Sequence, residues 1–369
     1  MRVVDFPSRV RGCVLGGAVG DALGAPVEFW GAKRIEERVG VAGVRDFLPV
    51  SFGDTSGVGL ITDDTQMTLF TLEGIIRAIN RQDRGVGFTV GVLQHAYLRW
   101  LDTQQLREPS GERDGWLQGQ RWLYSRRAPG NTCLAALQAT DTEQFGDAAR
   151  NDSKGCGGVM RSAPLGLLTG YSVGDDHFAY RMASDAAGFT HGHPTGQSAS
   201  GAMALLINRI VRDEPLTRAV TSTLEYLAAV GPDAAETSRA LTQAVDLAGR
   251  GEPSGQQLAL LGEGWIAEEA LAMSVYCALA YPGREQMLDA LALAVTHGGD
   301  SDSTGAICGN ILGALHGQQA VPAQLQIQLE GRGTILELCD DFVMAATQPE
   351  AFTSYDEHNE TWRSRYPGW

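Results

Sequence analysis

The sequence predicts an all-α protein, because apolar residues recur along it at three- and four-residue spacing, the period of a helix with one buried face. This spacing is found in 215–230, 233–249, 265–280, 284–295 and 334–347. Helices therefore follow helices almost without strands. The 369 residues contain no Pro/Ser-rich linker and no block of charge that would mark a boundary. We expect residues 1–369 to form a single compact domain.

The composition is that of a globular protein with a sizeable core. Hydrophobic residues make up 43% and charged residues 20%, which argues against disorder. The net charge of −15 argues against general binding to nucleic acid or anionic membranes, because clustered Lys and Arg hold phosphates. No apolar run is long enough to span a membrane, and the first residues lack the apolar core of a signal peptide. We expect a cytoplasmic protein, without a membrane partner, that is a monomer.

The cysteines suggest neither a zinc cluster nor a disulfide framework. Six of them are scattered through the chain, at 13, 133, 156, 277, 308 and 339, and no two form a C-x-x-C pair. We expect small buried residues in a reducing compartment.

The first predicted helix covers 10–24, and its glycines let another backbone approach closely. Its G-x-x-G spacings only weakly resemble a dinucleotide fingerprint, since no strand precedes them and no βα rhythm follows. Asp21 is assigned a structural role. Glu28 stands among apolar residues, where a lone carboxylate is costly unless it has a partner. A short irregular hairpin is expected in 45–60.

Further helices are expected in 88–102, 131–140, 176–189 and 197–211. In the first of these, His95 is expected to be packed rather than catalytic.

An acidic stretch opens the helix that follows residue 61. Thr62 and Asp63 are candidates for its cap, and Asp64 follows directly. Capping explains one Asp, but not two that are flanked by hydroxyls.

A second acidic stretch, 297–305, places Asp300 and Asp302 in a glycine-hinged turn at a helix start. Residues two apart cannot share a helix face, but in a turn they can converge on one point. Carboxylates so close repel one another unless a cation lies between them. Oxygen-only ligands suit Mg²⁺, Mn²⁺ or Ca²⁺, whereas zinc favours His and Cys. The alternative is that these residues simply cap the helix.

Two loops are candidates for ligand binding. Residues 151–164 form a glycine-rich loop that enters a helix, and consecutive N–H groups there can hold an anion such as phosphate. A tight packing turn is the alternative, since the spacing is not that of a Walker motif. In 190–196, His191 and His193 either bind a ligand or cap the helix that follows, and the pattern taken alone favours helix capping.

Taken together, these residues resemble the ADP-ribosylglycohydrolase family from Arg11 to about Gly317. Five pieces stand in the family's order: R-G-C-V-L-G-G-A-V-G-D-A-L-G with Glu28 soon after, T-D-D-T-Q-M-T, S-K-G-C-G-G-V-M-R-S-A-P-L-G, T-H-G-H-P-T-G and G-G-D-S-D-S-T-G-A-I-C-G-N-I-L-G-A. Each piece alone is weak evidence, but five in order are highly specific.

The resemblance implies a compact orthogonal helical bundle with a central cleft that holds ADP-ribose above two metal ions, Mg²⁺ or Mn²⁺. The motifs lie in about 9–318, and helices in 319–369 would pack on that core. The implied metal ligands are Thr62, Asp63, Asp64, Asp300, Asp302 and Ser303.

The resemblance also implies the substrate contacts. It makes Glu28 and Asp302 catalytic, with Glu28 beside the distal ribose and its water. The implied substrate-binding residues are Ser153, Gly155, Cys156, Gly157, Met160 and His191, whereas Arg161 is expected to be a structural anchor. Ser303 stands where many members have Thr, which keeps the hydroxyl. Cys156 stands where several have Asn, which removes a polar group.

The implied activity is metal-dependent hydrolysis of the N- or O-glycosidic bond between ADP-ribose and an acceptor. The substrate is then an ADP-ribosylated protein or a small ADP-ribose conjugate, and arginine is the favoured acceptor over serine, a nucleobase or an O-acyl group. Two cations can orient a ribose diol, lower the pKa of a bound water and stabilise an oxocarbenium-like transition state. The alternatives are an inactive, crystallin-like or ADP-ribose-binding relative, and a metal-dependent phosphohydrolase. A prenyl-diphosphate enzyme is disfavoured because the sequence has no D-D-x-x-D motif.

Overall fold

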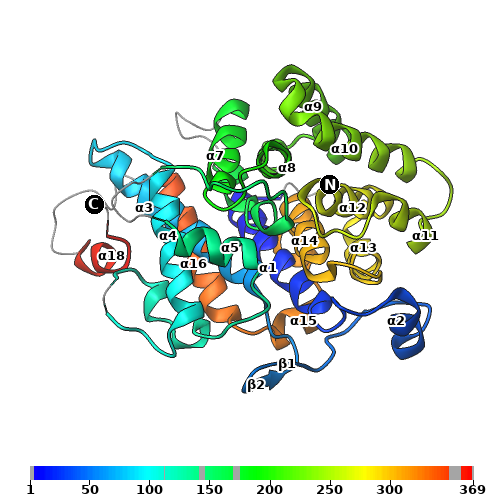
Figure 1. The fold of residues 1–369 in the computed structure, drawn as a ribbon, viewed down its shortest axis with the longest axis horizontal. Helices are drawn as coiled ribbons and strands as arrows, with labels where there is room; N and C mark the ends of the chain where they lie inside the picture. The colour runs from blue at the N-terminus through cyan, green and yellow to red at the C-terminus, as the bar shows by residue number, and fades with distance from the viewer. Residues whose placement is uncertain (1–3, 112, 141–145, 169–174, 349–358, 368–369) are drawn as a thin grey trace.

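The computed structural model describes residues 4–111, 113–140, 146–168, 175–348 and 359–367. Over these residues the all-α prediction is confirmed (Figure 1). The only strands described are β1 (Val50–Phe52) and β2 (Thr55–Gly57), which pair antiparallel and form the hairpin expected in 45–60.

Two helices from opposite ends of the sequence cross at the centre of the molecule. These are α1 (Phe6–Gly24) and α14 (Ser301–His316), which lie against each other in Figure 1. Glycines at four-residue spacing on each helix meet along the contact. A Cβ on Gly309 would lie 2.0 Å from the carbonyl oxygen of Gly16, so only glycine permits this approach. The close contact brings the end of α1 beside the start of α14.

Other helices surround this central pair. On one side lie α3 (Asp63–Asp83), α4 (Gly91–Gln105), α5 (Asn131–Gln138), α16 (Arg332–Thr347) and α18 (Glu360–Arg365). Above the pair in this view lie α7 (Asp176–Gly188) and α8 (Pro194–Val211), and towards the other side lie α9 (Leu216–Val230), α10 (Ala235–Ala248), α11 (Gly255–Leu258), α12 (Ala267–Ala280) and α13 (Met287–Val295). The remaining helices are α2 (Ala32–Val39), α6 (Ala163–Gly166) and α15 (Ala323–Gln328). The periodicity of the sequence predicted the other long helices to within a few residues, whereas for α3 and α14 only the starts were predicted.

The burial of His95 and of Cys156 differs from what the sequence predicts. His95 is exposed on α4 rather than packed, because the buried face of that helix runs through its neighbours Ala96 and Tyr97. All six cysteines are free thiols, and five are buried as expected, whereas Cys156 is half-buried. No helix among the described residues is long and apolar enough to cross a membrane.

Candidate active site

Asp21, a fully buried carboxylate on α1, holds the first turn of α3 in place. The N–H of Thr62 donates to its two oxygens at 3.1 and 3.0 Å. The N–H and the hydroxyl of Thr65 donate to Oδ2 of Asp21 at 3.1 and 2.5 Å. Thr62 is the N-cap of α3, and its Oγ1 accepts from the N–H of Asp64 at 3.3 Å. Asp21 is therefore structural, as the sequence suggested, and it fixes the turn that carries Asp63 and Asp64.

The turn before α14 depends on Gly299. A Cβ at this position would lie 2.0 Å from the carbonyl oxygen of Glu263, and that oxygen accepts from the N–H of Asp300 at 2.8 Å. The N–H of Ser303 donates to Oδ1 of Asp300 at 3.3 Å and to Oδ1 of Asp302 at 2.9 Å. Helix capping therefore accounts for one oxygen of Asp300, and its other oxygen is left for a different contact.

That other contact comes from the glycine-rich loop. The thiol of Cys156 donates to Oδ2 of Asp300 at 2.7 Å. The loop itself is tied to the segment before α12, because the N–H of Cys156 donates to the carbonyl oxygen of Trp265 at 3.2 Å. The N–H of Ala267 donates to the carbonyl oxygen of Lys154 at 2.8 Å. The predicted loop thus lies directly beside the start of α14.

These segments meet at a cavity of about 210 Å³. Its lining includes most of the predicted site residues: Glu28, Asp63, Asp64, Gly155, Cys156, Gly157, Met160, His191, Asp300, Asp302 and Ser303. Five separate parts of the sequence, each in a turn or loop or at a helix start, therefore supply one cavity.

Two predicted site residues do not line the cavity. Thr62 is fully buried beneath it as the cap of α3. Ser153 lies next to the lining, where its Oγ accepts from the N–H of Gly155 at 3.3 Å and lies 3.2 Å from the hydroxyl oxygen of Thr132.

Burial raises the pKa of every carboxyl group on this cavity, since removal from water disfavours the charged form. For Glu28, burial and then the charges of Asp300 and Asp21 raise the pKa to about 8. Burial also raises the pKa values of Asp63, Asp64 and Asp302 well above the ordinary range, and neighbouring carboxylates raise them further. The cavity is therefore a concentration of negative charge that favours a cation or bound protons.

The two histidines of 190–196 have different roles. His193 is the N-cap of α8, and its Nδ1 accepts from the N–H of Thr195 at 3.1 Å. His191 does not cap; it is 1% exposed and forms part of the cavity wall. Its Nδ1 lies 2.8 Å from Oγ1 of Thr190, and a guanidinium N–H of Arg161 donates to the same hydroxyl at 2.7 Å. Burial and then the charge of Arg161 lower the pKa of His191 to about 3, so the ring is neutral at neutral pH.

The sequence did not single out five further lining residues: Ala128, Gly130, Thr132, Cys133 and Trp265. Trp265 could have been suspected, because a Trp between glycine-rich turn residues and a helix has little chance of full burial. It is 39% exposed and stacks on Phe29, with 5.9 Å between ring centroids. The other four have no local signal, since they reach the cavity only through the packing of 128–133 against α3.

Comparisons with known proteins show the family of the chain. The model of the ADP-ribosylglycohydrolase family matches residues 3–351. A protein of Rhodospirillum rubrum named ADP-ribosyl-[dinitrogen reductase] glycohydrolase is 28% identical over 331 residues, which cover 85% of this chain and 88% of that protein. An uncharacterized protein of Archaeoglobus fulgidus is 30% identical over 313 residues, which cover 83% of this chain and 87% of that protein.

A solved structure, an ADP-ribosylglycohydrolase-related protein complex, has the same fold. Its TM-score is 0.65 at 24% identity, over 93% of this chain and 99% of that one. The protein is a hydrolase that acts on glycosyl bonds. Within that class, the chain belongs to the ADP-ribosylglycohydrolase family.

Proposed function

We propose that the chain cleaves the bond between ADP-ribose and an acceptor, most favourably a protein arginine, and that it uses two divalent cations, Mg²⁺ or Mn²⁺. The observation that carries the proposal is the convergence of five carboxylates, Glu28, Asp63, Asp64, Asp300 and Asp302, on one buried cavity. The Rhodospirillum rubrum relative is named for an ADP-ribosylated protein. Arginine is favoured because it is the commoner acceptor among the microbial proteins that the sequence resembles.

The donor set fits hard divalent cations. Every candidate ligand offers oxygen: Thr62, Asp63, Asp64, Asp300, Asp302 and Ser303. Oδ1 of Asp64 is buried and has no hydrogen-bond partner among the described residues, so it has a free acceptor for a cation. In the described part of the chain, no three His, Cys, Asp or Glu side chains are disposed as a preformed metal set. Bound cations would lower the pKa of a water and stabilise charge that develops on the ribose.

Glu28 is the best candidate for the proton acceptor. Its carboxyl lines the cavity from the turn after α1 and is 8% exposed. Burial and then the charges of Asp300 and Asp21 raise its pKa to about 8, and the positive charge of bound cations would hold the carboxylate ionised. A carboxylate in this position can orient a water and accept its proton as the glycosidic bond breaks.

The glycine-rich loop suits the diphosphate of ADP-ribose. A Cβ on Gly157 would lie 2.8 Å from Sγ of Cys133 and 3.2 Å from Cε1 of His191, so a side chain there would displace the cavity wall. Glycine leaves the backbone N–H groups open to an anion. Because the net charge is −15, backbone donors and cations must supply most of the attraction for phosphate.

Product analysis tests the proposal. Arginine-linked and serine-linked ADP-ribosyl proteins are each incubated with the full chain and Mg²⁺ or Mn²⁺, and released nucleotides are separated by chromatography. We expect free ADP-ribose from the arginine-linked substrate and none when EDTA is present. Release from serine alone would overturn the arginine assignment. AMP as the product would indicate a phosphohydrolase, and ADP-ribose binding without release would indicate an inactive relative.

A further inference from the structure

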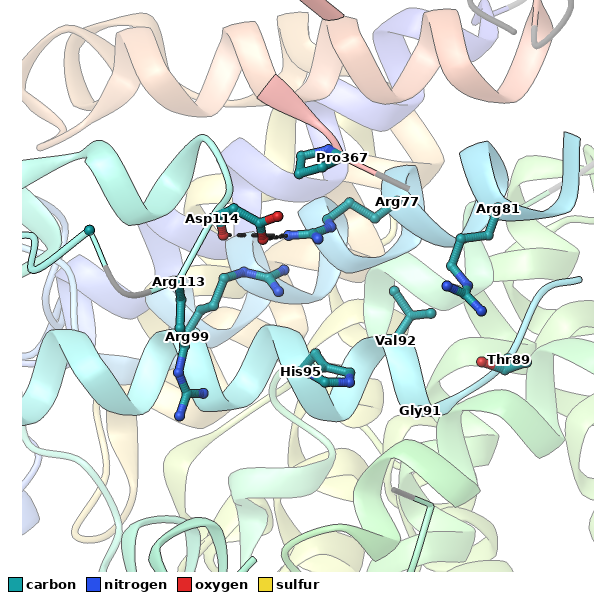
Figure 2. Close-up of a pocket in the computed structure, with 11 residues that line it drawn as sticks. Arg77, Arg81, Thr89, Gly91, Val92, His95, Arg99, Arg113, Asp114 and Pro367 are labelled. Atoms are coloured by element: carbon teal, nitrogen blue, oxygen red, sulfur yellow. Dashed lines mark hydrogen bonds and ion pairs between the residues drawn. The ribbon is translucent and has the colours of Figure 1, made fainter. Parts of the chain in front are cut away.

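A second and larger cavity lies away from the candidate active site. Its volume is about 600 Å³, and it is lined by residues of α3 and α4 together with Gly111, Arg113 and Asp114 (Figure 2). Arg77 and Arg81 reach it from the last turns of α3, the helix whose first turn carries Asp63 and Asp64. At 1.5 Å per residue, the two sites are separated by about 20 Å along this helix.

The lining of this cavity is strongly basic, although the chain as a whole is acidic. Among the residues that the structure describes, four arginines line it, namely Arg77, Arg81, Arg99 and Arg113, together with one acidic residue, Asp114. Figure 2 shows the guanidinium groups of Arg77, Arg81 and Arg99 in the space between α3 and α4, with that of Arg113 farther to the side. Clustered like charges are unfavourable without counter-charges, so the partners of each guanidinium decide what the cavity can bind.

Three of the arginines have a carboxylate partner. Arg77 donates to Oδ1 of Asp114 at 2.8 Å. Arg99 donates to Oε2 of Glu73 at 3.0 Å in a pair that is almost completely buried. Nε of Arg113 lies 3.3 Å from Oδ2 of Asp102.

Arg81 is different. Its Nε is buried and has no hydrogen-bond partner among the described residues. Within the described ranges no ion pair to its guanidinium is found. The charge of Arg81 is therefore the least compensated of the four, which favours an anionic ligand.

The pKa of His95 reflects the positive electrostatic potential in this cavity. It projects from α4 into the opening between the arginines (Figure 2). Partial burial, followed by the positive charges of Arg99, Arg77, Arg113 and Arg81, lowers its pKa to about 4. The neutral imidazole adds a hydrogen-bonding group without adding repulsion.

We propose that this cavity, which we call the arginine pocket (Arg77, Arg81, His95, Arg99, Arg113 and Asp114), binds a small molecule that carries two or more phosphate groups. Guanidinium forks match the geometry of phosphate oxygens and bind them with paired hydrogen bonds. The volume lies within the range of ordinary ligand sites. More than one phosphate is favoured because the arginines line the cavity from separate elements: Arg77 and Arg81 on α3, Arg99 on α4, and Arg113.

The test is calorimetric titration of the full-length protein with sodium pyrophosphate in buffer without divalent cations and with EDTA. The double variant Arg81→Gln/Arg113→Gln removes the two less buried guanidiniums and leaves the buried Arg99–Glu73 pair intact. We expect pyrophosphate to bind the wild type with a Kd below about 1 mM and the double variant at least about tenfold more weakly. The matched control Arg218→Gln changes an exposed arginine on α9 and should bind as the wild type does. Circular dichroism checks that each variant is folded.

Two further measurements show where pyrophosphate binds. In NMR spectra of histidine-labelled protein, assigned with His95→Gln, pyrophosphate should raise the pKa of His95, because the added negative charge favours the imidazolium. Asp302→Asn, in the candidate active site, should leave pyrophosphate binding unchanged, so this proposal and the proposed function can fail separately. Absence of binding, or binding that the double variant does not weaken, would overturn the proposal. Loss of binding in Asp302→Asn would assign the ligand to the active-site cavity instead.

Discussion

Asp21 accepts hydrogen bonds from both the backbone N–H and the hydroxyl of Thr65, at 3.1 and 2.5 Å, and so ties α1 to the first turn of α3. This contact is the structural basis of the first prediction. Asp21→Ala leaves these donors and the N–H of Thr62 without a partner in a buried site. We expect a loss of about 1–3 kcal/mol in the free energy of unfolding and a larger loss of activity, because the turn that carries Asp63 and Asp64 is released. Urea denaturation and product assays measure the two effects.

The matched control for Asp21 is Asp5→Ala. Asp5 also accepts a capping hydrogen bond, from the N–H of Ser8 at 2.7 Å, but at the start of α1 away from the cavity. Loss of this capping hydrogen bond should lower the free energy of unfolding by about 1 kcal/mol and leave activity unchanged. Equal losses of activity in the two variants would contradict the positioning role of Asp21.

Asp302→Asn tests the metal assignment. The substitution removes one of several buried like charges, so the metal-free variant should be at least as stable as the metal-free wild type. Addition of Mg²⁺ or Mn²⁺ should raise the melting temperature of the wild type but not of the variant, because only a bound cation stabilises the folded state. Activity should be lost. If calorimetry finds that Asp302→Asn binds Mg²⁺ and Mn²⁺ with the affinity of the wild type, the metal assignment is wrong. Asp246→Asn, on the exposed face of α10, serves as the control.

Glu28→Gln should separate binding from catalysis. The amide keeps the size of the side chain but cannot accept a proton from water, so kcat should fall strongly while ADP-ribose affinity stays within about tenfold. Single-turnover rates and calorimetry on the same preparation give both numbers. Near-normal turnover would remove Glu28 from the catalytic residues. Glu37→Gln, an exposed change on α2, should behave as the wild type.

His191 predicts a pH dependence of stability. Its folded-state pKa of about 3 lies below the unfolded value of about 6.5, so the unfolded chain takes up a proton that the folded chain does not. The stability of the wild type should therefore fall relative to His191→Gln as the pH drops from about 6.5 towards 3, by at most about 1.4 kcal/mol per unit. Urea denaturation at several pH values gives the difference between the two proteins. If the free energy of unfolding depends on pH in the same way for the wild type and His191→Gln, His191 takes up its proton in the folded protein as it does in the unfolded one.

Gly309→Ala tests the central crossing of α1 and α14. A Cβ there would lie 2.0 Å from backbone atoms of Gly16, and overpacking of this kind costs about 1–3 kcal/mol or more. The control is Gly333→Ala near the start of α16, where a Cβ would meet nothing within 4 Å. That change should leave the protein as stable or slightly more stable. If both variants melt at the wild-type temperature, the two helices can separate at little cost.

What the sequence determined by itself is local. Helical periodicity predicted the long helices, because the burial of one face needs only residues three and four apart. The acidic pair Asp63–Asp64 and the turn with Asp300 and Asp302 were visible because each lies within a few residues of a helix start. The order of five motifs predicted the family, since motif order survives divergence of the residues between motifs.

Only the tertiary structure decided how these pieces meet. Asp63 and Asp300 lie far apart in the chain, and they share a cavity because glycines let α1 and α14 approach closely enough to align the start of α14 with Asp21 and α3. Trp265 and Cys133 reach the same cavity through packing that no local pattern encodes. The arginine pocket is the clearest case, because Arg113 lines the same cavity as Arg77, Arg81 and Arg99 only in the folded chain. Charge in a sequence is a property of single residues, whereas an electrostatic site depends on distances between residues, and these distances exist only in the folded chain.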